Sequence, residues 1–413
     1  MNKIAIITSG TLPVPATKGG GVESLVEILL NENENKQEFE FTVFTIFDKN
    51  SINIQKEYRF SKFVNIDEKP LSRKITILFN RYLYAVNRRI LKKPWLMLQA
   101  PFCRFILKKG KLGDFDAVLV ESNFNIVPLL KRAGAKKVLY HSHYNDVHPG
   151  ISKFEMQRYN YGYNFVDANL SVSNFIQRNI QKVIKKKLDY FVIENCTPLF
   201  DMIDNIEKER IFTQYGIPKG KTIFMYSGRI TPEKGVTQLL NAYKLLNNLD
   251  DICLVVVGGI FYSDNRENEF LKNLKIMATQ CTNPVIFTGY VAHQEMLKLW
   301  QVANIAVLPT YDVEEAAGLV VIEAMAAGIP VIHSDSGGMG EYSSPECAIM
   351  IPRGKGFVDC LGKKMEYLCQ SPEVLNEMSR KARIRAQEWS SENYYAKLCK
   401  SIKKVIAKEE IEK

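Results

Sequence analysis

The sequence predicts an α/β protein made of two Rossmann-like domains that face each other across a central cleft. Short apolar runs rich in β-branched residues alternate with amphipathic, helix-period segments, which is the pattern of a largely parallel sheet covered on both faces. The pattern starts at the N-terminus and restarts near residue 221. A chain of 413 residues also exceeds what one hydrophobic core usually organises. Both observations indicate two domains.

Each half of the chain supplies one set of strands and helices. Runs such as KIAIITS and DAVLVES belong to the first set, and KTIFMYSGR and ICLVVVGG to the second. We expect a first domain over residues 1–198, including a basic helical segment at 71–111, and a second domain over 199–388. A final helix is expected over 389–413, with the C-terminal helices crossing back to the first domain.

Composition places the chain among globular proteins, with 46% hydrophobic and 24% charged residues. No apolar run is long enough to span a membrane, and the first residues lack the pattern of a signal peptide. The eight cysteines are scattered without a C-x-x-C pair, which favours reduced thiols over a disulfide framework or a zinc site. We therefore expect a cytoplasmic protein.

Four stretches carry residues suited to a ligand at the carboxyl ends of parallel strands, where open α/β sheets bind their ligands. The first is TKGGGVES, in which Gly20 and Gly21 permit close backbone approach before a helix whose N–H groups suit an anion. The second is SGRITPEKGV, in which Arg229 and Lys234 suit a diphosphate. A tight turn and two solvated cations explain the same residues equally well.

The third stretch is EEAAGLVVIEAMAAGIPVI, which spans residues 314–332. We expect a helix that starts after Gly318, stops at Gly328 and holds Glu323 in its second turn, with Glu315 in the loop before it. The helix start lacks a capping side chain, so its N–H groups are available to a phosphate. Glu323 suits the hydroxyls of a ribose, although a salt-bridged helix residue is an equal alternative.

The fourth stretch is VLYHSHYND, in which His141 and His143 follow a strand of the first half. A turn after His141 would separate the two side chains, so we expect only one of them to enter the cleft. No third ligand is apparent, which argues against zinc. Asp114 and Asp116 spell D-x-D but enter a strand instead of leaving one, which places them at the wrong edge for a ligand.

Together these stretches resemble glycosyltransferase family 4, nucleotide-sugar enzymes of the GT-B fold. The resemblance rests on SGRITPEKGV, LVVVGG, NIAVLPT and the E-x7-E element EEAAGLVVIEAM, and on LPVPATKGGGVES in the first half. It covers nearly the whole chain outside residues 50–112. Thr310 stands where serine is usual, without touching the proposed chemistry, and Ala317 stands where an aromatic residue is frequent.

The resemblance implies a role for each matching residue. Glu323 would hold the ribose, Glu315 the hydroxyls of the transferred sugar, and Gly20 and Gly21 would approach the phosphates. Catalytic residues implied by the resemblance are Arg229, Lys234, Glu315 and His143, the last of these near the reacting sugar. Donor-binding residues implied in the same way are Glu323, Gly20, Gly21, Ala317, Gly318, Leu319 and Val320.

The resemblance further implies a retaining transferase of the hexosyltransferase type that needs no metal and no cofactor besides its nucleotide-sugar substrate. The acceptor would be a glycan or a lipid-linked molecule in cell-surface polysaccharide biosynthesis. A GT-B sugar-nucleotide epimerase and an inactive sugar-nucleotide-binding scaffold at a membrane are the alternatives.

The positive charge of the chain is local. Residues 73–111, here called the basic segment, contain eleven lysines and arginines and no acid, against a net charge of +10 for the whole chain. Aromatic residues such as Trp95 are interleaved with the cations, a pattern typical of helices at an anionic membrane surface and also of a solvated helix face. No nucleic-acid recognition motif is visible. We expect peripheral association with the inner face of the membrane and no nucleic-acid partner.

Overall fold

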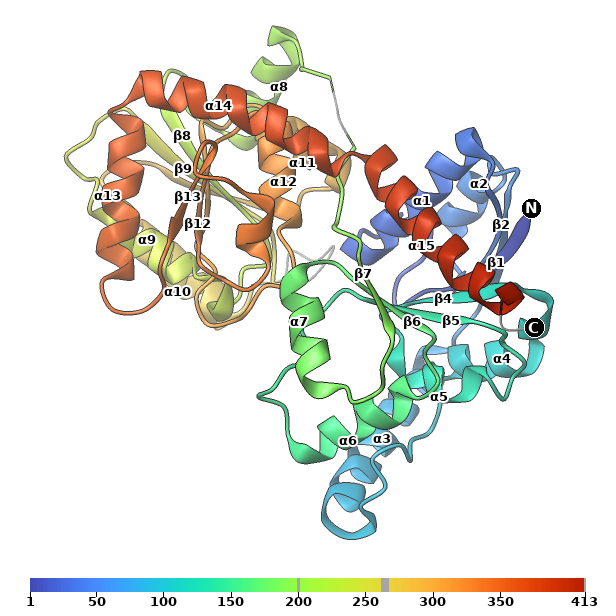
Figure 1. Ribbon diagram of the computed structural model, residues 1–413. Coiled ribbons are helices and arrows are strands. Elements are labelled where there is room, and N and C mark those ends of the chain that lie inside the picture. Colours follow the sequence, from blue (N-terminus) through green and yellow to red (C-terminus); the bar gives the residue numbers. More distant parts are fainter. Residues whose placement is uncertain (199–200, 261–266, 412–413) are drawn as a thin grey trace. The chain divides into compact units, whose positions relative to one another are not determined.

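The computed structural model of the chain describes residues 1–198, 201–260 and 267–411 (Figure 1). It divides into two compact units. Unit 1 comprises residues 1–194 and the chain from Ser391 onward, and unit 2 comprises Asn195–Ser390. The domain boundaries expected from the sequence, after residues 198 and 388, differ from these unit boundaries by at most four residues. Residue 199, where the second domain was expected to begin, lies outside the described residues.

Unit 1 is built on a seven-stranded sheet in which every neighbouring pair is parallel. The strand order is β3-β2-β1-β4-β5-β6-β7, so the order reverses between β1 and β4. The central strands are apolar on both faces, as expected for a sheet with helices on both sides. The strands are β1 (Asn2–Ile7), β2 (Phe39–Ile46), β3 (Ser61–Ile66), β4 (Ala117–Glu121), β5 (Val138–Ser142), β6 (Ala168–Ser171) and β7 (Asp189–Val192).

The helices of unit 1 connect these strands, and one more comes from the end of the chain. They are α1 (Gly21–Lys36), α2 (Lys49–Gln55), α3 (Pro70–Val86), α4 (Pro101–Lys109), α5 (Val127–Leu130), α6 (Lys153–Tyr163), α7 (Asn174–Val183) and α15 (Ser391–Ile411). Short turns of other helix types complete the set: η1 (Asn87–Leu91), η2 (Leu112–Asp114) and η3 (Phe124–Ile126).

Unit 2 repeats the same plan with six parallel strands. The order is β10-β9-β8-β11-β12-β13, and it reverses between β8 and β11. The strands are β8 (Thr222–Ser227), β9 (Ile252–Val257), β10 (Val285–Gly289), β11 (Ile305–Leu308), β12 (Val331–Ser334) and β13 (Ala348–Ile351). The two-domain α/β prediction is confirmed.

The helices of unit 2 lie on both faces of its sheet. Successive residues of β8 alternate: Met225 joins one buried cluster with residues of α11, α12 and α14, and Phe224 joins another with residues of α9, α10 and α13. The helices are α8 (Asn205–Tyr215), α9 (Val236–Lys244), α10 (Glu269–Ala278), α11 (His293–Trp300), α12 (Leu319–Ala326), α13 (Phe357–Cys369) and α14 (Pro372–Ala386). Shorter turns are η4 (Pro232–Lys234), η5 (Met339–Tyr342) and η6 (Gln387–Trp389).

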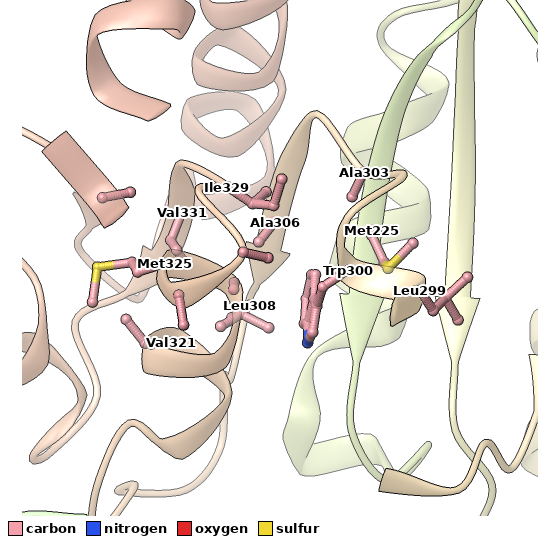
Figure 2. Close-up of a cluster of buried hydrophobic side chains, with 14 of the residues drawn as sticks. Met225, Leu299, Trp300, Ala303, Ala306, Leu308, Val321, Met325, Ile329 and Val331 are labelled. Atoms are coloured by element: carbon pink, nitrogen blue, oxygen red, sulfur yellow. The ribbon is translucent and has the colours of Figure 1, made fainter. Parts of the chain in front are cut away.

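The cluster beneath α12 is organised around Trp300. Figure 2 shows the indole of Trp300 between Leu308 on one side and Met225 and Leu299 on the other. Trp300 is fully buried, and an aromatic ring of this size contributes a large share of the apolar area that a core removes from water. The carboxyl end of β11 and the helix that follows it therefore rest on a rigid base.

The basic segment runs through α3, η1 and α4 of unit 1. It is anchored through aromatic contacts with α6, since Trp95 stacks on Tyr161 at 4.6 Å and Tyr84 meets Phe154 edge-on at 5.3 Å. Among the described residues, no helix combines the length and apolar character that a membrane crossing requires.

Helix α15 completes unit 1 although it is last in the sequence. It packs against α1, and the hydroxyl of Tyr395 donates a hydrogen bond of 2.8 Å to Asn33 Oδ1. Leu398 and Ile402 are fully buried. The expectation that the C-terminal helices return to the first domain is confirmed for α15, whereas α14 stays in unit 2.

We predict that Leu398→Ala destabilises unit 1 by about 2–5 kcal/mol, the usual cost of removing a buried leucine side chain and leaving a cavity. Urea unfolding followed by circular dichroism would measure the loss. The matched control is Lys400→Ala, an exposed substitution on the same helix, which should stay within about 0.5 kcal/mol of wild type. Equal stability of the two variants would contradict the burial described for α15.

Candidate functional site

The two sheets offer a ligand position at the same topological point. Ligands of open parallel sheets bind beyond the carboxyl ends of the strands, where the strand order reverses. In unit 2 that point lies between β8 and β11, and in unit 1 between β1 and β4. The residues singled out in the sequence follow these strands or their immediate neighbours.

The turn after β8 packs closely on the end of β11. Gly235 has φ +76°, and a Cβ atom there would lie 1.9 Å from the carbonyl oxygen of Pro309, so no other residue fits without displacing the backbone. The backbone N–H of Tyr311 donates to the carbonyl of Glu233 at 3.0 Å. This close approach carries Lys234 to the loop that follows β11.

Lys234 and Glu315 contact each other directly. The ammonium of Lys234 donates to Oε1 of Glu315, and the hydroxyl of Thr310 donates to the same oxygen at 2.9 Å. The side chains are 20% and 18% exposed, so the pair is largely shielded from water. The hydroxyl of Thr310 thus helps to hold the carboxylate of Glu315, a contact that the sequence did not indicate.

The backbone of Glu315 is held by the turn after β12. Its N–H donates to Ser336 Oγ at 3.0 Å, and its carbonyl accepts from the N–H of Gly338 at 2.8 Å. A Cβ atom on Gly337 would lie 2.1 Å from the carbonyl oxygen of Glu315. Ser336 and Gly337 were not singled out in the sequence, because nothing in it indicates that the two loops touch.

Arg229 takes a different position. Its side chain is 45% exposed, and its Nη2 lies 3.9 Å from Oε1 of Glu233, a loose surface contact. Its carbonyl accepts a hydrogen bond of 2.7 Å from the hydroxyl of Tyr226, which fixes the backbone at the end of β8. The structure thus brings Lys234 and Glu315 together and leaves the guanidinium of Arg229 facing solvent.

Helix α12 starts as the sequence predicts. Gly318 is the N-cap, no side chain caps the first turn, and no acid lies in it. Gly318 packs against the side chain of Tyr342, where a Cβ atom would lie 3.2 Å from Cβ and 3.3 Å from the ring. Ala317, Leu319 and Val320 are half-buried around this start. An uncapped helix N-terminus with a positive dipole end is suited to an anion.

Glu323 is buried in the second turn of α12, with 6% of its surface exposed. Within the described part of the chain, the one basic group within 4.0 Å of its carboxylate is His293, whose Nδ1 lies 3.7 Å from Oε1. Burial raises the pKa of Glu323, and the charge of His293 and the indole N–H of Trp300 oppose this only in part. A buried carboxylate so weakly paired is costly for the protein and suited to a ligand that donates hydrogen bonds. His293, the first residue of α11, had no signal in the sequence beyond its position.

In unit 1 the glycine loop is folded around another acid. Gly20 has φ +110°, and a Cβ atom there would lie 2.4 Å from Oε2 of Glu23. Ser9 donates a hydrogen bond of 2.6 Å to the other oxygen of Glu23. Burial raises the pKa of Glu23, although the hydrogen bond from Ser9 opposes it. A phosphate near Gly20 and Gly21 would therefore meet this carboxyl group, which is tolerable while it is protonated.

Two histidines and a glutamate form a buried cluster at the same edge of unit 1. His143 Nε2 lies 2.5 Å from Glu121 Oε2, and His141 Nδ1 lies 3.1 Å from the same oxygen. The two imidazole rings are 4.0 Å apart. We call Glu121, His141 and His143 the histidine–glutamate cluster. The expectation that a turn separates the histidines is wrong: β5 continues through Ser142, so both side chains point to the same side.

The surroundings of Glu121 and His143 lower the pKa values of both groups. Burial opposes ionisation of Glu121, but the charge of His141 and hydrogen bonds from both imidazoles outweigh it and lower the pKa of Glu121 to about 2. Burial and the neighbouring charge of His141 lower the pKa of His143 to about 4, against the opposing effect of Glu121. At neutral pH Glu121 is a carboxylate and His143 is neutral.

The cluster also supplies the third ligand that the sequence did not reveal. Glu121, His141 and His143 form a group whose ligand atoms lie within 4.8 Å of one another, the geometry of a possible metal site. Asp116, by contrast, lies before β4, where its carboxylate accepts from the N–H of Lys3 at 2.9 Å. The D-x-D sequence is at the amino edge, as expected.

Comparison with known proteins finds similarity to glycosyltransferases. Residues 207–385 match the family described as glycosyl transferases group 1. YtcC of Bacillus subtilis, named for a proposed glycosyltransferase activity, is 22% identical over 92% of this chain and 86% of its own length. A lipopolysaccharide 1,2-N-acetylglucosaminetransferase of Salmonella typhimurium is 35% identical over 33% of this chain and 36% of its own.

Solved structures share the fold of both units. Anabaena HepE in complex with UDP-glucose has a TM-score of 0.74 at 15% identity, covering 98% of this chain and all of that one. A sucrose-phosphate synthase of Thermosynechococcus elongatus has a TM-score of 0.73 at 19% identity, covering 98% of this chain and all of that one. The chain has the two-domain GT-B fold, and the comparisons support a glycosyltransferase.

We predict that Glu323→Gln makes the protein without ligand more stable at pH 8, by about 1–3 kcal/mol, because it removes a poorly paired buried charge. Since the pKa of Glu323 is raised above its ordinary 4.5, its contribution to stability is present below that pH and is lost as the pH rises through the folded-state pKa. Glutamine does not titrate, so the difference between variant and wild type should grow with pH.

Urea unfolding between pH 4 and pH 8, followed by tryptophan fluorescence, to which the buried Trp300 and Trp389 of unit 2 contribute, measures this difference. Asp250→Asn, an exposed change in the same unit, serves as the control and should behave as wild type. A stability difference that does not change with pH would show that Glu323 is adequately paired within the protein.

Proposed function

We propose that this protein is a retaining glycosyltransferase of family 4, which moves a hexose from a nucleoside-diphosphate sugar to a hydroxyl of a glycan or lipid-linked acceptor. The observation that carries the proposal is in unit 2. A lysine–glutamate pair, an uncapped helix start and a buried, weakly paired carboxylate lie together at the point where the strand order reverses. Each suits one part of a nucleotide sugar.

The donor is held along α12 and the loops beside it. Glu323 accepts hydrogen bonds from the two ribose hydroxyls, which supply the partners that its buried carboxylate lacks. The backbone N–H groups of Leu319 and Val320 meet the diphosphate at the helix N-terminus. Lys234 and Arg229 add positive charge, and Arg229 is exposed enough to reorient toward the ligand.

The transferred sugar lies near Glu315 and the backbone of Ala317 and Gly318. Its hydroxyls donate to the carboxylate of Glu315, which shares Lys234 with the diphosphate. In unit 1, Gly20, Gly21 and His143 are the residues that we propose to bind substrate. The complexes of HepE with UDP-glucose and with UDP support a nucleoside-diphosphate sugar as the kind of donor.

Transfer proceeds on one face of the sugar. The bond from the anomeric carbon to the diphosphate breaks, and its electron pair leaves with the diphosphate. The acceptor oxygen bonds to the oxocarbenium-like carbon from the same side, and its proton passes to a diphosphate oxygen. Lys234, Arg229 and the start of α12 stabilise the developing negative charge, for which one such donor contributes about 2.7–4 kcal/mol. These residues perform this chemistry without a metal or other cofactor.

The acceptor is proposed to lie at an anionic membrane surface, in the assembly of a cell-surface polysaccharide by a cytoplasmic, peripheral enzyme. Large apolar side chains of the basic segment remain exposed, among them Leu78 at 70%, Tyr82 at 66% and Ile90 at 72%. Arg88, Arg89 and other exposed cations lie between them. Apolar side chains that enter the interface beside cations that meet lipid phosphates are the signature of such a surface.

We predict that the protein, incubated with an acceptor extract and a panel of nucleotide sugars, releases nucleoside diphosphate from one donor and extends the acceptor. The anomeric configuration of the product, read from its proton coupling, should match the donor. Isomerised donor without extension would instead show an epimerase, and binding without turnover a scaffold.

With the active donor, Glu323→Gln should raise the donor KM at least tenfold, since two hydrogen bonds to a charged group are weakened. Lys234→Ala and Arg229→Ala should lower kcat by roughly 10²–10³-fold. Lys219→Ala, an exposed lysine paired with Glu209, is the control and should leave both constants unchanged. Wild-type constants in any of the three variants would remove that residue from the site.

We predict that replacing Arg88, Arg89, Lys92 and Lys93 together by alanine reduces sedimentation with phosphatidylglycerol vesicles at least tenfold, since each cation near such a surface contributes about 1 kcal/mol. Neutral phosphatidylcholine vesicles should bind neither protein appreciably. Four exposed cations elsewhere in unit 1 provide a control variant with the same change of charge: Lys56, Lys62, Arg132 and Lys182. If both variants lost vesicle binding equally, net charge would explain the effect and the position of the cations would not.

A further inference from the structure

The histidine–glutamate cluster contains an acid to which no role has yet been given. Glu121 is the last residue of β4 and pairs in register with His141 of β5. It is 1% exposed, and His141 and His143 are 0% and 8% exposed. A carboxylate this deep in the protein persists only where hydrogen-bond donors face it.

The contacts determine which ring nitrogen of His143 carries the proton. Nε2 of His143 lies 2.5 Å from Oε2 of Glu121, a distance that requires a hydrogen between the two atoms. Two imidazole nitrogens face Oε2 of Glu121, at 2.5 Å and 3.1 Å, and an oxygen placed between two such groups acts as their shared acceptor, so Nε2 is the donor. In a neutral imidazole the remaining nitrogen, Nδ1, then holds a lone pair.

We propose that Glu121 is a positioning residue that holds His143 in the Nε2–H tautomer and keeps Nδ1 as the acceptor for a substrate hydroxyl. The proposal rests on the proposed function in one respect, namely that the substrate of this site is a sugar, rich in hydroxyl donors. It explains why a neutral histidine lies at the edge of the sheet, with its proton directed into the protein.

His141 completes the surroundings of the carboxylate. His141 Nδ1 faces Glu121 at 3.1 Å and 3.4 Å from its two oxygens, and its Nε2 is buried without a hydrogen-bond partner among the described residues. Its ring lies against that of His143, with the two ring centroids 4.0 Å apart. The two histidines are therefore the hydrogen-bond partners that face the carboxylate of Glu121.

A metal ion is the alternative occupant of the cluster. Two histidines and a glutamate form a known zinc ligand set, but ligand atoms bound tetrahedrally at 2.0–2.1 Å lie about 3.3 Å from each other. The contact of 2.5 Å between His143 and Glu121 is much shorter than this. A shared hydrogen fits the geometry, and a shared metal would require the carboxylate to move away.

The tautomer is measurable without any enzyme assay. The chain contains five histidines, so long-range ¹H–¹⁵N correlation on ¹⁵N-histidine-labelled protein gives few signals, and His143→Gln identifies those of His143. We expect a pyrrole-type Nε2 and a pyridine-type Nδ1 for His143 in the wild type. In Glu121→Ala the signals should shift toward a mixture of tautomers. A pyridine-type Nε2 in the wild type would overturn the proposal.

Kinetics with the active donor test the consequence. Glu121→Ala should lower kcat/KM roughly 10- to 100-fold, the size of one impaired substrate hydrogen bond, and Glu121→Gln should recover part of it because its amide oxygen still accepts. Asp116→Asn, at the opposite end of β4, is the matched control and should behave as wild type. Unchanged tautomer and activity in Glu121→Ala would also overturn the proposal.

Zinc titration separates the remaining alternative. We expect wild-type protein mixed with Zn²⁺ and then desalted to retain no stoichiometric metal by elemental analysis. One Zn²⁺ per chain that is lost in both Glu121→Ala and His141→Ala would overturn the proposal. The proposed function fails separately: a wild type that has the expected tautomer but transfers no sugar from any donor refutes the transferase and leaves the role of Glu121 in the tautomer standing.

Discussion

Burying a carboxylate costs free energy, and this cost determines how glutamates are arranged at the carboxyl ends of the strands in both sheets. Four glutamates lie there, and each is accommodated differently. Glu121 is ionised between two imidazoles, and Glu23 is hydrogen-bonded to Ser9 with a raised pKa. Glu315 is paired with a lysine, whereas Glu323, among the described residues, has a histidine at 3.7 Å and the indole N–H of Trp300 beside it. The better a carboxylate is paired within the protein, the less free energy a ligand gains by pairing with it. Glu323 is therefore the group from which a ligand gains most, and Glu121 the group suited to fixed positioning.

Close contacts between the backbones of neighbouring loops hold Lys234 and Glu315 in position. Gly235 lets the turn after β8 rest on Pro309, and Gly337 lets the turn after β12 rest on Glu315. Both contacts join loops that come from neighbouring strands of the sheet. The sheet itself therefore sets the separation between Lys234, Glu315 and the start of α12, and the core around Trp300 keeps that base rigid. A ligand meets a site whose backbone is already arranged.

Much of the fold was predictable because its determinants are local. Strands, helices and the uncapped start of α12 follow from periodicity, from Gly318 and from the stop at Gly328. The parts that were missed depend on pairing between distant segments. Glu121 is placed beside His141 by the register between β4 and β5. Thr310 contacts Glu315 because of the conformation of the loop between them. Neither contact can be read from the sequence around one residue. The expectation that a turn separates His141 from His143 was wrong because β5 extends to Ser142. A difference of one or two residues in the end of a strand is within the usual error of such an assignment.

The return of α15 to unit 1 has a consequence for how the protein is made. Unit 1 starts with the first residue but lacks one of its packing helices until the ribosome has finished unit 2, residues 195–390. At ordinary rates of synthesis this takes roughly 10–40 s. Throughout that time, the apolar surface of unit 1 that Leu398 and Ile402 later cover stays open. The nascent chain therefore passes through a long-lived intermediate that is prone to aggregation. Protection by a chaperone matters most for unit 1.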